Sequence, residues 1–290
     1  MPAKETPERQ AFFAGLRAQA IQRLDAPSAA PSRDAIVGAR LDALRDGLSG
    51  PYTVDGASVT ARPMFRMNGG ANEASAREHA PELRRIAARA GVSAEMVLLG
   101  RGSARDLVKV TQALIDAGHL PPPPGDVATR IRQMQWEWGI GIDCAGYTYL
   151  AAIAASGANA KALGLREVGM ENFRALDGNR AFRKIDPSSA RPGDVMTLDP
   201  LPPETVGHNV IVRSLTTVGS RHFIEVDSSW GAGPYGADYG GFRRDTWIYD
   251  ESTKLWTSFD PHVTPPVERT SSEGPAGERF HGGYRPKVGT

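Results

Sequence analysis

The spacing of apolar residues changes once along this chain, from a helical period to a strand period, and this change limits the folds open to it. Up to Ala155, apolar positions recur every three or four residues and predict helices. These are expected over 7–24, over 32–47, over 73–90, over 104–117, from 127 onward, and over 145–155. Later alternating runs predict strands over 194–198, 209–215, 222–226, 246–249 and 255–259. Helices followed by strands, rather than alternating with them, indicate an α+β fold.

Two local signals suggest how the chain is divided. Asp55-Gly56 stands between short β-branched runs and predicts a hairpin over 53–62. The prolines over 121–124, followed by a glycine, cannot continue a helix. We therefore expect an α-rich accessory region over 1–125 and a main domain over 126–262. The Pro-, Gly- and Ser-rich segment 263–290 lacks periodicity, so we expect it to be loosely ordered.

Composition excludes several classes of function. A single cysteine among 290 residues excludes an internal disulfide and a Cys-based zinc site, and a net charge of +1 gives no reason to expect nucleic acid as a partner. No two histidines have the spacing of a helical metal pair, and no phosphate loop is present, so no metal or cofactor is expected. The charged N-terminus lacks the apolar core of a signal peptide, and no run is long enough to span a membrane. We expect a cytoplasmic protein as synthesised, with any export by a route other than a cleaved signal.

The lone Cys144 is a candidate nucleophile. It follows a loop containing Gly139 and Gly141 and opens an Ala- and Leu-rich run, so it is predicted to lie in the first turn of a helix. Unpaired backbone N–H groups and the positive end of the helix dipole favour a thiolate there. The alternative is a small buried residue without reactivity, since free cysteines are often buried.

His208 is the best candidate for the base that such a thiol needs. It begins an apolar run directly after Gly207, at the edge of a predicted sheet. Glu225 and Asp227 are two residues apart, so the strand period places both carboxylates on one face, where either could orient the imidazole. His222, also on a predicted strand, is the second candidate for the base. The alternative for the carboxylates is a face turned to solvent.

Aromatic residues flank these candidates in the sequence. Trp136 and Trp138 precede the cysteine, and Trp230 and Tyr235 follow the carboxylates. They are candidates for lining a substrate cleft, and core packing explains them equally well.

Four short motifs in this order resemble those of the papain-fold cell-wall cysteine hydrolases of the NlpC and CHAP types. They are Asp143-Cys144-Ala145-Gly146, Arg191-Pro192-Gly193-Asp194, the run from Gly207 and His208 to Val212, and Ile224-Glu225-Val226-Asp227, with Trp136-Glu137-Trp138-Gly139 upstream. The resemblance covers roughly residues 126 to 230. It departs from the family at Ala145, where serine is usual, at Trp136, where many relatives have tyrosine, and at Asp227, where CHAP relatives have asparagine.

The resemblance implies a papain-like fold with the nucleophile at a helix N-terminus packed on an antiparallel sheet. It also implies a cysteine amidohydrolase that cleaves an amide bond of bacterial peptidoglycan, as a stem-peptide endopeptidase or as an amidase, through a thioester. Catalytic roles would fall on Cys144, His208 and either Glu225 or Asp227, and Asp143 would contact a substrate amine.

Delivery as an antibacterial effector, which would involve an immunity protein or a secretion machine as partner, and a phage-type lysin are both compatible with this interpretation. A transglutaminase- or deamidase-like toxin acting on protein glutamine would use the same order of residues. A non-catalytic binding module on the same fold, with the α-rich region as its docking surface, is the third hypothesis.

Overall fold

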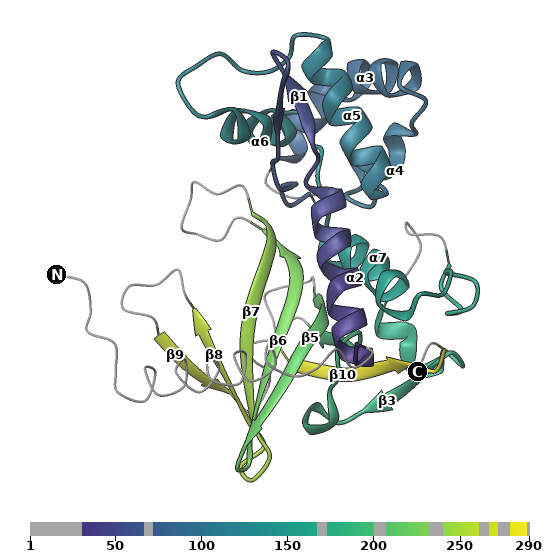
Figure 1. The fold of residues 1–290 in the computed structure, drawn as a ribbon, viewed down its shortest axis with the longest axis vertical. Helices are drawn as coiled ribbons and strands as arrows, with labels where there is room; N and C mark the ends of the chain where they lie inside the picture. The colour runs from purple at the N-terminus through teal and green to yellow at the C-terminus, as the bar shows by residue number, and fades with distance from the viewer. Residues whose placement is uncertain are drawn as a thin grey trace, which may run out of the picture.

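The computed structural model describes residues 31–66, 72–166, 173–199, 207–231, 240–260, 267–271 and 279–288. It combines helices with a large antiparallel sheet, which confirms the predicted α+β class (Figure 1). The helix expected over 7–24 lies outside the described residues. No helix in the described ranges is long and apolar enough to cross a bilayer.

The predicted helices form close to their expected bounds. They are α2 (Arg33–Leu48), α3 (Glu73–Arg89), α5 (Ala104–Asp116), α6 (Val127–Glu137) and α7 (Cys144–Ser156), joined by the short, unpredicted α4 (Ala94–Leu98). Side chains cap the starts of α2, α5, α6 and α7; at α2, the Ser32 hydroxyl accepts a hydrogen bond from the backbone N–H of Ala35 at 3.2 Å. Gly91 and Gly118 have positive φ just after α3 and α5, the backbone conformation that ends many helices.

The described strands form two sheets. The hairpin pairs β1 (Tyr52–Val54) with β2 (Ala57–Val59), and Asp55 and Gly56 both have positive φ, as such a two-residue turn requires. The other strands are β3 (Phe182–Ile185), β4 (Val195–Asp199), β5 (His208–Val218), β6 (Arg221–Trp230), β7 (Gly241–Asp250), β8 (Leu255–Asp260), β9 (Val267–Ser271) and β10 (Arg279–Pro286). They form one antiparallel sheet in the order β3-β10-β4-β5-β6-β7-β8-β9.

The C-terminal segment corrects an expectation. We expected loose order over 263–290, but β10 lies inside the sheet between β3 and β4. A buried ion pair holds it there: the Arg285 guanidinium donates to both carboxylate oxygens of Asp194, at 2.9 and 2.7 Å. The strand escaped prediction because Gly282 and Gly283 interrupt its apolar pattern, while pairing on both edges supplies its backbone hydrogen bonds.

The elements gather into two lobes (Figure 1). We call the hairpin with α3–α6 the helical lobe, and the large sheet with α2 and α7 the sheet lobe. The expected boundary at 121–125 does not divide the packing: Ile131 of α6 packs with Tyr52 and Val54 of the hairpin, and Val37 and Leu41 of α2 share a core with α7. Both lobes therefore contain elements from each side of the proline run.

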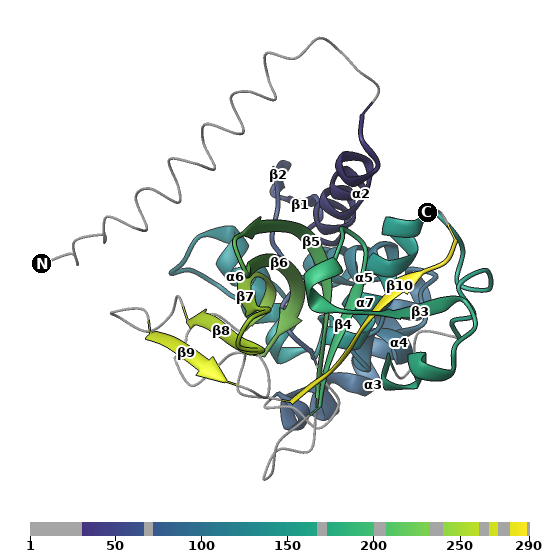
Figure 2. The same cartoon turned by 90° about the horizontal axis from the view of Figure 1, so that it is seen from below.

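The two faces of the large sheet bury different cores. Val195 and Ile211 join the core that contains α7. Their neighbours Met196 and Val210 belong to a second core on the other face, as the strand period requires. Because the sheet curls (Figure 2), we call this second face the concave face.

Candidate functional site

Cys144 is the first residue of α7, as predicted. The helix starts there because Asp143 is its N-cap: one carboxylate oxygen accepts a hydrogen bond from the backbone N–H of Gly146 at 2.5 Å. Cys144 is only 7% exposed. The cysteine therefore lies at a helix N-terminus, but in a closed setting.

The helical lobe fixes the entry to α7. The backbone N–H of Ile142 donates to the carbonyl of Met64 at 3.0 Å, and that of Asp143 donates to the carbonyl of Gly100 at 2.7 Å. Gly100 has a φ of +74°, and a Cβ there would lie 1.9 Å from the carbonyl oxygen of Arg66. Only glycine fits so close to this carbonyl oxygen. The loop between α4 and α5 therefore sets the position of the cysteine.

Cys144 lies where β5 and β6 separate. The ladder between these strands ends at the pair Ile211 and Asp227. Beyond that pair, the backbone N–H of Asn209 forms a hydrogen bond to the Cys144 sulfur, and the Ser229 hydroxyl donates to the carbonyl of Ile142 at 2.7 Å. The entry to α7 thus occupies the space between the two strand ends.

His208 immediately precedes Asn209, so the predicted nucleophile and base come from adjoining positions in space. The imidazole is 6% exposed and lies on the concave face, where its strand partner is Leu198. Its Nε2 is 3.1 Å from the Ser228 hydroxyl, and Trp230 stacks on the ring with 3.5 Å between centroids. Within the described ranges no hydrogen bond joins the thiol to the imidazole. The structure brings the two segments together without showing a formed dyad.

The orienting residue differs from the expectation. Glu225 and Asp227 do share a face, but it is the face opposite to that of His208. Asp227 accepts hydrogen bonds from Arg45 at 3.1 Å and Arg244 at 2.9 Å. Glu225 accepts one from the Ser214 hydroxyl at 2.8 Å. Neither carboxylate bonds to the imidazole, and that position belongs to Ser228.

The residues expected to face the imidazole were wrong by one position along the strand. In a strand, a shift of one residue turns a side chain to the other face. The resemblance directed attention to the carboxylates, whereas Ser228 and Trp230 alternate with them and face the imidazole. The signal that could have found them was the polar-x-aromatic spacing of Ser228-Ser229-Trp230 at the end of a strand.

The electrostatics also correct an expectation. Burial, followed by the nearby Asp143 carboxylate, raises the pKa of the Cys144 thiol to about 12, although the Asn209 N–H acts in the opposite direction. Burial and the positive charge of Arg243 lower the pKa of His208 to about 3. Burial therefore disfavours the charged form of both groups, and for Cys144 it opposes the effect of the helix dipole.

The predicted substrate-binding residues lie in three different places. Asp143 is buried and ion-paired with Arg101, whose Nε is 3.1 Å from the carboxylate, so this residue has a structural role instead of facing a substrate amine. Trp138 is buried in the helical lobe between the rings of His79 and His119. The half-buried Trp136 is near the end of α6.

Of the predicted aromatic residues, Trp230 lies at the candidate site. Tyr235 lies outside the described residues. His222, the second candidate for the base, is at the other end of β6, where its ring nitrogens are 3.0 Å from Thr217 and 3.4 Å from Glu251. The part of the chain that the structure describes contains no group of three or more His, Cys, Asp or Glu residues that could hold a metal ion.

Comparison with protein-family models, with curated proteins and with solved structures found no match to this chain. Function is therefore inferred from the geometry at the start of β5, where His208 lies.

Proposed function

We propose that this protein is a papain-like cysteine hydrolase that cleaves an amide bond through a thioester on Cys144. One observation carries the proposal: a cysteine at the first position of a helix, bonded by the backbone of Asn209, adjoins a histidine whose far nitrogen is held by a serine hydroxyl. Nucleophile, base and orienting group thus come from three elements that meet at one end of the sheet.

The contact between His208 and Ser228 supports one proposal for the proton transfers. With Nε2 bonded to Ser228, we propose that Nδ1 is the nitrogen that accepts the proton of the thiol. In the proposed reaction, the Cys144 sulfur attacks the carbonyl carbon while its proton passes to Nδ1, and the backbone N–H of Cys144 stabilises the oxyanion. The imidazolium then protonates the leaving amine as the C–N bond breaks. Water, deprotonated at Nδ1, hydrolyses the thioester and regenerates the thiol.

The neutral resting state affects how this chemistry would start. With the pKa of Cys144 near 12 and that of His208 near 3, proton transfer in the resting protein is unfavourable. Attack and deprotonation would have to be concerted, with the substrate carbonyl accepting the charge as it forms. We therefore expect slow turnover and weak reactivity toward general thiol reagents.

The substrate class rests on the family resemblance. The ordered motifs around Cys144, Asp194 and His208 are similar to those of cell-wall hydrolases, and we propose a peptidoglycan peptide as substrate. Digestion of purified peptidoglycan, with mass analysis of the released fragments, tests this. Wild-type protein is expected to release muropeptides with a new amine and carboxylate, whereas Cys144→Ala and His208→Ala release none.

A second function is supported by the burial of the site. Cys144 is 7% exposed and His208 is 6% exposed, and this burial also suits a binding module that keeps the fold without the reaction. If wild-type protein and Cys144→Ala bind peptidoglycan equally and neither releases a fragment, the binding module is the correct function. Ammonia release from a protein glutamine, without any muropeptide release, would instead indicate a deamidase.

A further inference from the structure

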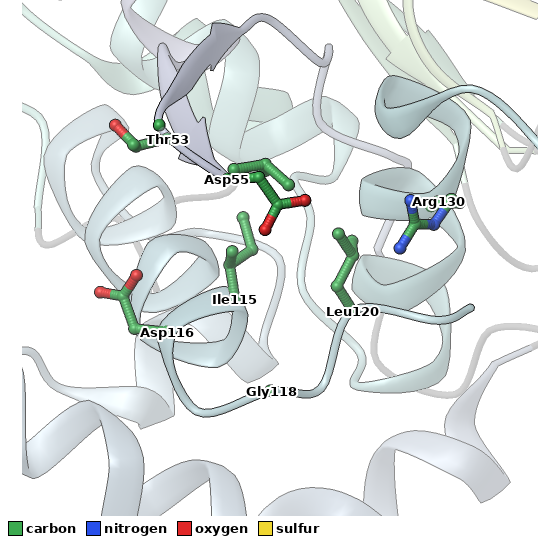
Figure 3. A pocket seen from close by; sticks show the side chains of 9 residues that line it. Thr53, Asp55, Ile115, Asp116, Gly118, Leu120 and Arg130 are labelled. Atoms are coloured by element: carbon green, nitrogen blue, oxygen red, sulfur yellow. The ribbon is translucent and has the colours of Figure 1, made fainter. Parts of the chain in front are cut away.

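A hollow in the helical lobe, away from Cys144, contains charged groups of both signs that the proposed chemistry does not use. Its volume is about 450 Å³, within the range of small-ligand sites. The hairpin, the end of α5, the loop after it and α6 line it (Figure 3). The lining residues are Thr53, Val54, Asp55, Gly56, Ile115, Asp116, Gly118, Leu120 and Arg130.

The negative side of this hollow is formed by two carboxylates. Asp55 projects from the hairpin turn, and within the described ranges its carboxylate forms no hydrogen bond or ion pair. Asp116, the last residue of α5, is at the end where the helix dipole is negative. One of its oxygens accepts a hydrogen bond from Gln112 at 2.7 Å. A ligand ammonium would be favoured on this side.

The positive side is Arg130 of α6. Its Nε donates to the carbonyl of Pro121 at 2.6 Å, which fixes the guanidinium at the wall of the hollow. No ion pair joins Arg130 to Asp55 among the described residues, and Figure 3 shows Leu120 between them. Leu120 provides an apolar floor between Asp55 and Arg130, and Ile115 lies between Asp55 and Asp116 in the same view.

The hollow is also held in shape without a ligand. The Gln112 side chain accepts from the backbone N–H of Thr53 at 2.8 Å and donates to its carbonyl at 3.0 Å, so α5 and the hairpin are fixed to each other. A preformed site needs less ordering when a ligand binds.

We propose that this hollow binds the zwitterionic ends of a short peptide, with its ammonium at Asp55, its carboxylate at Arg130, and an apolar side chain over Leu120. The inference is independent of the proposed hydrolysis, because none of these residues contacts the Cys144 site. It assigns the helical lobe a peptide-binding role of its own.

A dipeptide series tests the charges one at a time. Gly-Leu, N-acetyl-Gly-Leu and Gly-Leu-amide are titrated into ¹⁵N-labelled full-length Cys144→Ala protein, and the amide signals of Gly56 and Gly118 are followed. Free Gly-Leu is expected to shift both signals, and blocking either end is expected to weaken binding about tenfold, the effect of one charge-assisted contact.

Variants then assign each charge to its partner. In Asp55→Asn the effect of acetylation should disappear while that of amidation remains, and in Arg130→Gln the reverse should hold. Arg130→Lys, which keeps the charge, should bind more tightly than Arg130→Gln, and the exposed Asp46→Asn on α2 should match the parent protein. Gly-Leu failing to move either signal, or blocked and free dipeptides binding alike, would overturn the proposal. All titrations use Cys144→Ala protein, which lacks the proposed nucleophile. A failure of the proposed hydrolysis therefore cannot produce either of these two outcomes.

Discussion

At the scale of single residues, the serine at position 228 has the clearest role. Its hydroxyl is the hydrogen-bond partner of the His208 Nε2, at 3.1 Å, on the face away from both predicted carboxylates. If Ser228 positions the imidazole, its hydroxyl sets which ring nitrogen faces the thiol. A residue that positions the imidazole can be told from one that only packs against it by which property changes when its side chain is removed.

Ser228→Ala is expected to lower kcat about tenfold, equivalent to ~1.4 kcal/mol, and to leave KM nearly unchanged. The reason is that the ring loses orientation while substrate contacts persist. Steady-state kinetics on purified muropeptides measure both constants, and Ser228→Thr, which keeps the hydroxyl, should recover most of the rate. Equal kcat values for Ser228→Ala and wild type would exclude the positioning role.

His208 should also affect stability as the pH changes. Its pKa falls from 6.5 to about 3 on folding, so its contribution is complete above pH 6.5 and is lost as the pH falls toward 3. Over that window the unfolded chain binds a proton that the folded protein does not. Each pH unit should therefore remove at most about 1.4 kcal/mol.

The comparison is between wild type and His208→Gln, unfolded with urea at pH 7 and pH 5. The loss of unfolding free energy between these pH values should be about 2 kcal/mol smaller in the variant. An identical loss in both proteins would mean that the imidazole titrates alike in the folded and unfolded states, which would contradict its burial.

At the scale of elements, Asp227 joins α2 to the sheet, and we assign it no part in the proposed reaction. The carboxylate is 1% exposed and lies within 3.1 Å of Arg45, 2.9 Å of Arg244 and 3.5 Å of Arg213. One buried acid therefore links α2, β5 and β7. Removing its charge would leave these guanidinium groups without their common partner.

Asp227→Asn is expected to lower the free energy of unfolding by about 3 kcal/mol while kcat stays unchanged at temperatures where the protein is folded. Asp42→Asn is the control, because that carboxylate is 56% exposed and pairs with the same Arg213 and Arg244; it should cost less than about 1 kcal/mol. A fall in kcat with unchanged stability would contradict this assignment and would mean that Asp227 acts in catalysis.

The last strand provides a second prediction at this scale. Asp194, from the Pro-Gly-Asp motif, also accepts a hydrogen bond from the backbone N–H of Arg191 at 2.7 Å, so one carboxylate holds both its own turn and β10. Arg285→Met leaves this buried acid unpaired and should lower the unfolding free energy by about 3–5 kcal/mol. Arg279→Gln, on the same strand but in an exposed pair, should change it by less than about 1 kcal/mol. Similar urea midpoints for the two variants would contradict this account of β10.

At the scale of the whole molecule, the two lobes depend on each other. The helical lobe supplies the carbonyl oxygens of Met64 and Gly100 that fix the entry to α7, and α2 covers the same face of the sheet as α7. A fragment beginning at residue 126 lacks all of these groups. We expect it to give poorly dispersed NMR spectra and no activity; a folded, active fragment would show that the sheet lobe is self-sufficient.

Local patterns predicted much of this fold. Helices with caps such as Ser32 and Asp143 form where apolar spacing and capping residues agree, and the Asp55-Gly56 turn fixes its hairpin. β10 could not be predicted, because two glycines hide its pattern and its stability comes from distant strands and Asp194.

The candidate site was predictable only in part. Cys144 and His208 were found from their places at element starts, and the structure brings their segments together. Ser228 was missed because face assignment depends on register. The raised pKa of the thiol depends on burial. The residues next to Cys144 in the sequence do not reveal how deeply it is buried.

The central claim is that Cys144 becomes covalently acylated by its substrate. The direct test is intact-protein mass spectrometry after mixing with muropeptides and quenching in acid within seconds. The account predicts a mass increase equal to one acyl fragment, located at Cys144, present in wild type and absent from His208→Ala. Release of muropeptides by Cys144→Ala, or turnover by wild type with no adduct and with undiminished rate after alkylation of Cys144, would contradict it.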